Sequence, residues 1–161
     1  MDSVVIDLLK GPSGADAAAR ITWLKKTHFA VASADSSLTQ MAEPLRQAIE
    51  ISEKLEKAPD KEKPGAELVL MSLMVKVQGL ALYAYLEELN KMRNLVAAEA
   101  TKLKVDSPER QKAETLQIAY EQALDGLARA YNGLRSGNFE EMKTIGPVME
   151  NVRKVADELR K

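Results

Sequence analysis

The sequence contains a single histidine, His28, which is the side chain best suited to exchange a proton at neutral pH. An imidazole of ordinary pKa titrates at about pH 6.5 and can act as an acid or a base in catalysis. His28 lies in an apolar setting, because Phe29 to Ala32 follow it directly. Histidines in such runs are more often packed or half-exposed structural side chains. We therefore expect His28 to be structural.

Acidic residues come in adjacent pairs, which is a poor arrangement for acid–base catalysis. Neighbouring residues of a helix point in different directions, so they do not share a site. A catalytic carboxylate also needs burial or a nearby like charge to shift its pKa. The pairs are Glu87–Glu88, Glu140–Glu141 and Asp157–Glu158, whereas Glu50, Glu53, Lys54 and Lys57 are expected to form a solvated charged face. We predict that the chain is not an enzyme and has no catalytic residue.

Metal and cofactor sites are also not expected. The chain has no cysteine, which excludes thiolate metal sites, and one histidine, which excludes sites that need two. The stretch from Ser107-Pro108-Glu109 to Arg160 is similar in its caps and helix lengths to the last two helices of small four-helix b-type cytochromes. Those helices use a histidine as an axial haem ligand, and this stretch contains none. The resemblance implies a helical bundle without haem.

The charge balance argues against nucleic acid as a partner. Lys and Arg number 23 and Asp and Glu number 24, which gives a formal net charge of -1. Such a chain has no net field that would attract a polyanion over a distance. The most basic stretch, from Lys91 to Lys104, contains no interleaved aromatic residues on which bases could stack.

A stripe of small side chains runs along one predicted helix at steps of four, three, four and three residues. Glycine inside a helix costs about 1 kcal/mol relative to alanine, so two glycines in the stripe require a reason. One explanation is close packing of helix backbones inside the bundle. The other is room for a partner helix or a small apolar ligand. The stripe consists of Ala119, Ala123, Gly126, Ala130 and Gly133.

The most apolar part of the chain runs from Leu68 to Leu86 and is a second candidate for a partner or ligand surface. It is about long enough to span a bilayer. Lys76 and Gln78 lie at its centre, so we predict a buried helix and no membrane insertion. Because this helix is apolar around most of its circumference, the segment from Val4 to Leu9 or a second subunit should cover it. The candidate residues are Leu68, Met71, Val75, Leu82 and Leu86.

Helical periodicity and helix-breaking residues divide the chain into a few long elements. The residue types favour helix throughout, without the period-two alternation of strands. We expect breaks at Gly11-Pro12-Ser13-Gly14 and near residue 35, a kink at Pro44, and a bend or restart at Gly146-Pro147. Ser107 and Gly137 should cap the third main helix, and Asn138 should cap the fourth. The expected helices are 16–57, 66–104, 108–135 and a last helix from residue 138, with a loop at 58–65.

These elements predict an all-α fold: an antiparallel bundle of four main helices, one or two of them kinked or broken, plus a short N-terminal helical segment. We expect residues 1–161 to form one domain and, since no signal peptide is recognisable at Met1 to Leu9, a cytoplasmic protein. The leading hypothesis is a non-enzymatic module that binds another protein or a second copy of itself, as an adaptor, chaperone or regulator does. The alternative is a sensor or carrier with an apolar cavity. In that case the kinks at Pro44 and Pro147 would open a cavity lined by Trp23, Phe29, Tyr83, Tyr85 and methionines.

Overall fold

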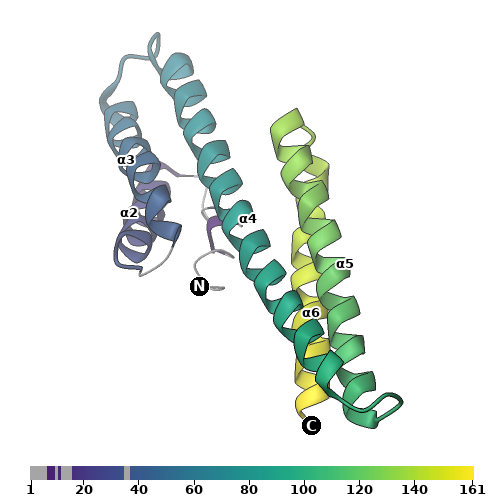
Figure 1. Cartoon of the computed structure of the whole chain (residues 1–161). Helices are drawn as coiled ribbons and strands as arrows, with labels where there is room; N and C mark the ends of the chain where they lie inside the picture. Colours follow the sequence, from purple (N-terminus) through teal and green to yellow (C-terminus); the bar gives the residue numbers. More distant parts are fainter. Residues whose placement is uncertain (1–6, 10, 12–15, 35–36) are drawn as a thin grey trace. The chain divides into compact units, whose positions relative to one another are not determined.

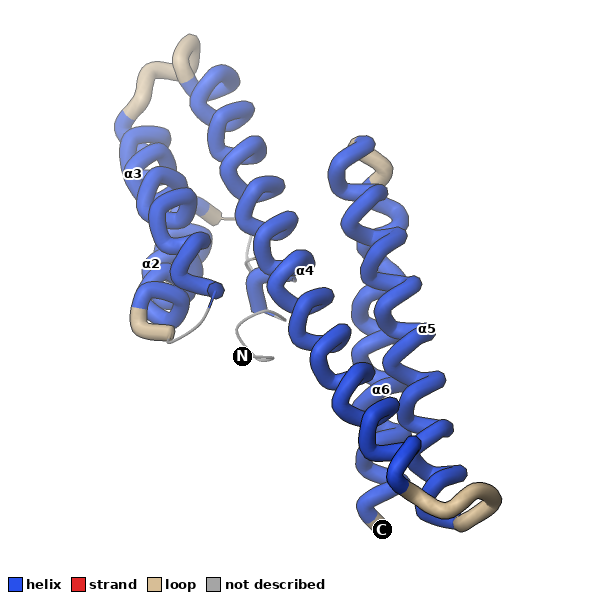
Figure 2. The backbone as a smooth tube through the Cα atoms, viewed as in Figure 1, coloured by secondary structure: helices blue, strands red, loops and turns tan. Residues whose placement is uncertain are grey.

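The computed structural model describes residues 7–9, 11, 16–34 and 37–161 (Figure 1). Helices make up most of this part of the chain, which contains no strand, and the loops between them are short (Figure 2). The predicted all-helical class is thereby confirmed. The labelled elements are α2 (Ala17–Ala32), η1 (Ser37–Met41), α3 (Ala42–Lys57), α4 (Lys63–Lys102), α5 (Pro108–Ser136), η2 (Phe139–Thr144) and α6 (Ile145–Arg160), where η marks a 3₁₀ helix.

Side chains satisfy backbone donors at the start of two helices. The carboxylate of Asp16 accepts a hydrogen bond from the Ala19 amide at 2.7 Å at the start of α2. At the start of α5, the Ser107 hydroxyl accepts one from the Arg110 amide at 3.2 Å. Pro108 is the first residue of α5, where a missing N–H costs nothing. The predicted Ser107 cap is confirmed.

The end of α5 is fixed by a left-handed residue. Gly137 has φ 79°, a conformation that side chains other than hydrogen disfavour. The Asn138 amide then donates a hydrogen bond to the Gly133 carbonyl at 2.8 Å, which satisfies an otherwise free acceptor. The predicted Gly137 cap is confirmed. The side chain of Asn138 makes no capping hydrogen bond to η2, contrary to its predicted role.

The break expected near residue 35 is confirmed, since α2 ends at Ala32 and η1 begins at Ser37. Residues 35 and 36 lie outside the described part, as do residues 4–6 of the expected N-terminal segment and residues 12–14 of the expected Gly-Pro break. Residues 7–9 are helical and Leu8 is fully buried.

The first turns of four helices contain Pro44, Pro64, Pro108 and Pro147, which corrects the kink expected at Pro44 and the loop predicted up to residue 65. Pro44 and Pro147 are each the third residue of a helix, α3 and α6, and therefore do not kink a long one. First-turn amides have no acceptor within the helix, so a proline is tolerated there. For the same reason α4 begins at Lys63 and includes Pro64, although residues up to 65 were predicted to be loop. The predicted restart at Gly146-Pro147 is confirmed by the change from η2 to α6.

Two compact units make up the chain, residues 1–84 and 85–161, and the boundary between them falls within α4. In the first unit, α2 and α3 pack against each other through buried aliphatic side chains. An ion pair between Lys25 and Glu53, at 2.7 Å, joins the exposed edges of these helices. Exposed pairs of this kind contribute at most about 1 kcal/mol, so apolar burial dominates. The buried side chains include Ile21, Leu24 and Val31 on α2, and Leu45, Ala48 and Leu55 on α3.

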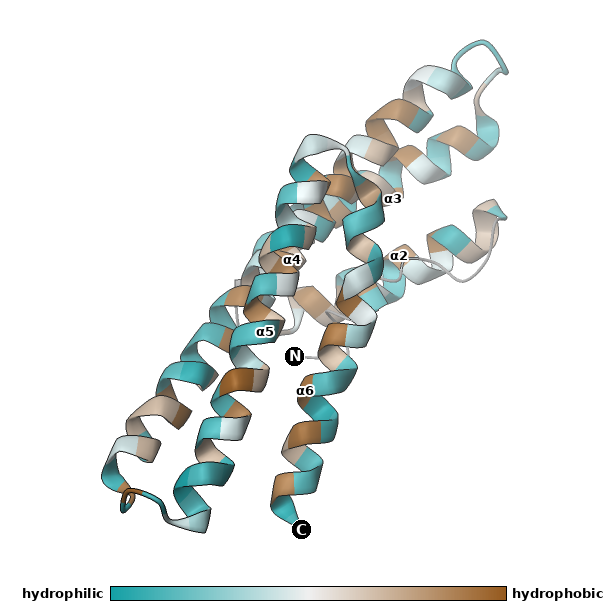
Figure 3. Cartoon of the chain, turned by 90° about the vertical axis from the view of Figure 1, so that its right-hand side faces the viewer, coloured by the Kyte–Doolittle hydropathy of each residue, from teal (hydrophilic) through white to brown (hydrophobic). Residues whose placement is uncertain are grey.

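In the second unit, α5 packs closely against η2 and α6. A Cβ atom added to Gly126 would lie 2.8 Å from a methyl group of Val148 on α6. A Cβ added to Gly133 would lie 2.7 Å from both the Asn138 carbonyl oxygen and the Glu141 Cβ. The two glycines therefore let the segments approach each other closely. Figure 3 shows apolar and polar residues interleaved along α6, as expected of a helix that buries one face.

These close contacts predict the effect of adding a methyl group at position 133. Gly133→Ala should destabilise the protein by about 1–3 kcal/mol, because the nearby backbone carbonyl cannot move away cheaply. Gly65→Ala is the matched control, since a Cβ there meets nothing within 4 Å. It should stabilise the protein by up to about 1 kcal/mol through helix propensity. Thermal unfolding followed by circular dichroism measures both, and equal midpoints for the two variants would contradict the close-packing explanation.

Candidate functional site

The first turns of α4 expose three large apolar side chains. The exposed fractions are 67% for Leu68, 50% for Val69 and 61% for Met71. Between them Leu70 is buried, so the same turns contribute to the core on their other side. Scattered exposed apolar residues are ordinary, whereas a cluster is typical of a binding surface. We call Leu68, Val69 and Met71 the α4 cluster.

Burial along α4 differs from the prediction of a buried helix. Leu68 and Met71 are exposed and Val75 is half-buried, whereas Leu82 is completely buried and Leu86 is half-buried. These five residues follow one stripe along the helix, so the stripe changes from exposed to buried along its length. The stripe is partly exposed because the helix is apolar around most of its circumference and its neighbours cover only part of it.

The same helix has the length and composition of a membrane span. It contains an 18-residue stretch that is apolar enough to cross a bilayer, and 33% of that stretch is buried in the structure. The core helix of a soluble protein meets the same criteria, so this finding is weak support for insertion. The sequence-based expectation of no membrane insertion stays a prediction.

The stripe of small residues on α5 lies in the core of the second unit. Ala119, Ala123 and Ala130 are buried, and so are Gly126 and Gly133. The contacts of the two glycines with Val148 and with the start of η2 match the close-packing interpretation of the stripe. No free surface remains along it for a partner helix. Of the two candidate surfaces, the beginning of α4 is therefore the accessible one.

An apolar hollow of about 290 Å³ lies at the end of the α3–α4 hairpin. Ile51, Leu55 and Ala58 line it from the end of α3, and Ala66 and Val69 line it from the start of α4. Lys54 and Glu62 supply its polar lining. The sequence does not predict this hollow. Its only signal there is a loop between two helices, which does not reveal whether the groove between them is filled.

A second, more polar hollow of about 540 Å³ adjoins the first. The two share Lys54, Ala58 and Glu62, and the second is also lined by the charged residues that the sequence assigned to a solvated face. That assignment fits their exposure. The additional lining residues are Glu50, Glu53, Lys57 and Pro59.

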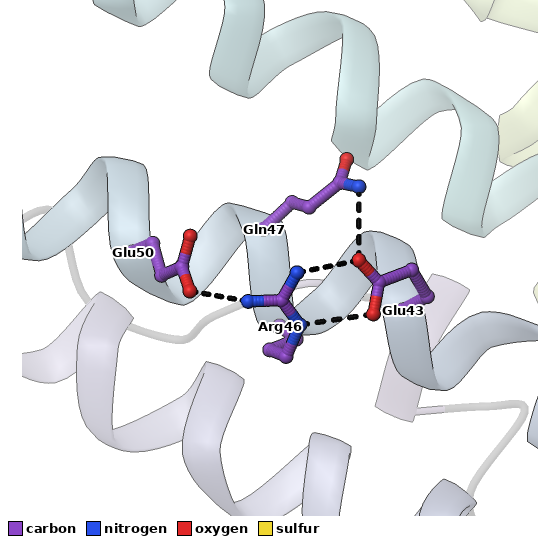
Figure 4. A network of polar contacts seen from close by, with 4 residues as sticks. All are labelled: Glu43, Arg46, Gln47 and Glu50. Atoms are coloured by element: carbon purple, nitrogen blue, oxygen red, sulfur yellow. Dashed lines mark hydrogen bonds and ion pairs between the residues drawn. The ribbon is translucent and has the colours of Figure 1, made fainter.

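Four side chains on α3 form a polar network (Figure 4). Arg46 donates hydrogen bonds to both carboxylate oxygens of Glu43, from Nη2 at 2.6 Å and from Nε at 2.9 Å, and also contacts Glu50. Gln47 Nε2 donates to Glu43 at 3.1 Å. The hydrogen bonds from Arg46, followed by that from Gln47, lower the pKa of Glu43 to about 2, and the two carboxylates raise the pKa of Arg46. A carboxylate held ionised in this way is unsuited to accept a proton at neutral pH.

The aromatic residues proposed to line a ligand cavity differ in burial: Phe29 and Tyr83 are exposed, Trp23 is half-buried and Tyr85 is buried. None of them lines either hollow. Within the described part of the chain, no three His, Cys, Asp or Glu side chains lie close enough together to hold a metal ion.

Comparison with known proteins finds no counterpart for this chain. No protein-family model, no curated protein and no solved structure matches it. The function is therefore inferred from the residues and their geometry, and the α4 cluster with the adjoining hollows is the surface to explain.

The hydrogen bonds to Glu43 predict its titration. Its pKa should be about 2, and Arg46→Ala should raise that pKa towards the ordinary value of 4.5. Because the pKa is depressed in the folded state, ionised Glu43 stabilises the fold above about pH 4.5, and this contribution is lost as the pH falls towards 2. An NMR titration of the Glu43 side-chain carboxyl measures its pKa. Arg93→Ala on α4 is the control, because it also removes a guanidinium but one that donates to the side-chain amides of Asn90 and Asn94 and not to Glu43. A wild-type pKa near 4.5 would contradict the network.

Proposed function

We propose that the chain is a non-enzymatic interaction module that binds an amphipathic helix of another protein through the beginning of α4. The exposure of the α4 cluster is the observation that carries this proposal. Docking the apolar face of a helix into an apolar groove is a common mode of protein recognition. The antiparallel four-helix bundle in one domain, expected from the sequence, is the scaffold we propose for it.

The hollow beside the α4 cluster supports a helical partner. Val69 belongs to both, so one residue of the α4 cluster borders the groove between α3 and α4. The exposed side chains of the α4 cluster could pack against the side of a partner helix, and the apolar hollow could receive one of its anchoring side chains. The charged residues of the second hollow would form the polar rim that surrounds such interfaces.

Three further features of the proposal come from the sequence. We propose that the protein is cytoplasmic, that its partner is a protein and not a nucleic acid, and that no bound cofactor is required. The near-neutral net charge of -1 supports the second feature. A second copy of the chain is the competing occupant of the α4 cluster, and the experiment below separates the two.

The double variant Leu68→Glu with Met71→Glu should abolish partner binding. Both side chains are exposed, so the change in unfolding free energy should stay within about 0.5 kcal/mol each. Charges at the centre of an apolar interface should weaken binding at least thirtyfold, or about 2 kcal/mol. Native mass spectrometry of untagged protein isolated from its own cells measures the bound chains.

Val105→Glu is the matched control, because Val105 is 65% exposed and lies in the loop between α4 and α5. We expect a partner protein to co-purify with the wild type and with Val105→Glu. The same partner should be absent from preparations of the double variant. A homo-oligomer that the double variant dissociates would assign the α4 cluster to a second copy. A wild-type protein that is a bare monomer and does not enhance the fluorescence of an apolar dye would refute the interaction module.

A further inference from the structure

One lysine interrupts the otherwise uncharged part of α4 that contains the α4 cluster. Between Glu67 and Glu87, the only charged residue is Lys76. Its side chain is exposed, and it forms no ion pair within the described residues. The first half of α4 therefore presents a single uncompensated positive charge on an apolar background.

Lys76 lies on the same stripe of the helix as Val69, the residue of the α4 cluster that borders the apolar hollow. The two are seven residues apart, which is close to two full turns and about 10 Å along the helix axis. Ser72 lies between them on this stripe, and all three side chains are exposed. A helix that docks lengthwise along α4, with one side chain in the hollow, therefore passes over Ser72 and reaches Lys76.

The nearest carboxylates of α4 itself are badly placed to pair with Lys76. Glu67 lies nine residues before it, or two and a half turns, and is therefore on the opposite side of the helix. Glu87 lies eleven residues after it, about 16 Å along the axis. The same positions argue against a second copy as the occupant. An antiparallel α4 that packed over this stripe about a twofold axis would set Lys76 opposite Val69, which offers no negative charge.

A partner that covers the stripe removes water from Lys76, and an ammonium group buried without a counter-charge is costly. We propose that the partner helix carries an aspartate or glutamate that pairs with Lys76, about seven residues from the side chain that enters the hollow. This inference rests on the proposed function, since it concerns the partner of the α4 cluster. The charge pair fixes the register of the docked helix, which apolar contacts with Leu68 and Met71 alone do not.

Lys76→Met tests the charge, because methionine keeps a long unbranched side chain and removes the ammonium group. Binding of the partner that co-purifies with the wild type, measured by calorimetry on the full chain, should weaken about tenfold. Lys91→Met, which removes another exposed lysine of α4, is the matched control and should leave the Kd unchanged. A purely apolar contact predicts tighter binding by Lys76→Met, so an unchanged or lower Kd for this variant would overturn the proposal.

A zero-length cross-link locates the paired carboxylate. A water-soluble carbodiimide joins an amine directly to a carboxylate that it contacts, and the wild-type complex is the sample. Mass spectrometry should find Lys76 joined to an aspartate or glutamate of the partner, in a segment whose apolar residues recur at steps of three and four. Cross-links of Lys76 that lead only to carboxylates of this chain would overturn the proposal.

The double variant Leu68→Glu with Met71→Glu separates this inference from the proposed function. If the double variant loses the partner and Lys76→Met keeps it at full affinity, the α4 cluster binds the partner and the role of Lys76 is refuted. If both variants keep the partner, the proposed function fails as well. A homo-oligomer that Lys76→Met tightens would assign the stripe to a second copy and overturn the proposal, and so would a wild type isolated without any partner chain.

Discussion

The apolar circumference of α4 is the constraint on which the rest of the structure depends. Burial of the flank that contains Leu70, Val77 and Ala81 removes apolar surface from water at about 25 cal/mol per Å². The remaining circumference, at Leu68 and Met71, is left uncovered at the beginning of the helix. Some exposed apolar surface is ordinary in proteins, but a cluster of this size on one helix lowers solubility unless a partner or ligand covers it. Binding of a partner helix, as proposed above, would cover part of this surface.

Helix ends were predictable from the sequence because they depend on local chemistry. The hydroxyl of Ser107 and the left-handed backbone of Gly137 act within one turn of their own positions, so their effect does not require the fold. The break before residue 37 follows from local signals in the same way. Prolines were harder to interpret, because a proline kinks a helix only when residues on both sides are helical. Pro44 instead lies in the first turn of α3, which is shorter than the sequence pattern indicated, whereas the restart expected at Gly146-Pro147 is present at the start of α6.

Burial was predictable only where neighbouring segments are close in sequence. The stripe at Gly126 and Gly133 packs against the segments that follow α5 directly, so steps of three and four residues were enough to identify it. The exposure of Leu68 depends instead on how many helices surround α4, and periodicity does not contain that number. The hollow beside Lys54 depends on the spacing between two helices, which is set by the sum of many side-chain contacts. A candidate surface could therefore be named from the sequence, but its accessible part could not.

The position of the unit boundary within α4 has a consequence for the order in which the chain acquires structure. Residues 63–84 of this 40-residue helix belong to one compact unit and residues 85–102 to the other. Starting a helix is unfavourable, whereas extending one adds a hydrogen bond for each residue that is fixed. Whichever unit forms first thus supplies a nucleus from which α4 can extend into the second. Because the two units share the backbone of α4, a loss of helical order in one unit removes the helical end from which the other unit's part of α4 extends. Protection of the backbone amides against hydrogen exchange should therefore decline gradually along α4, starting from the more stable unit.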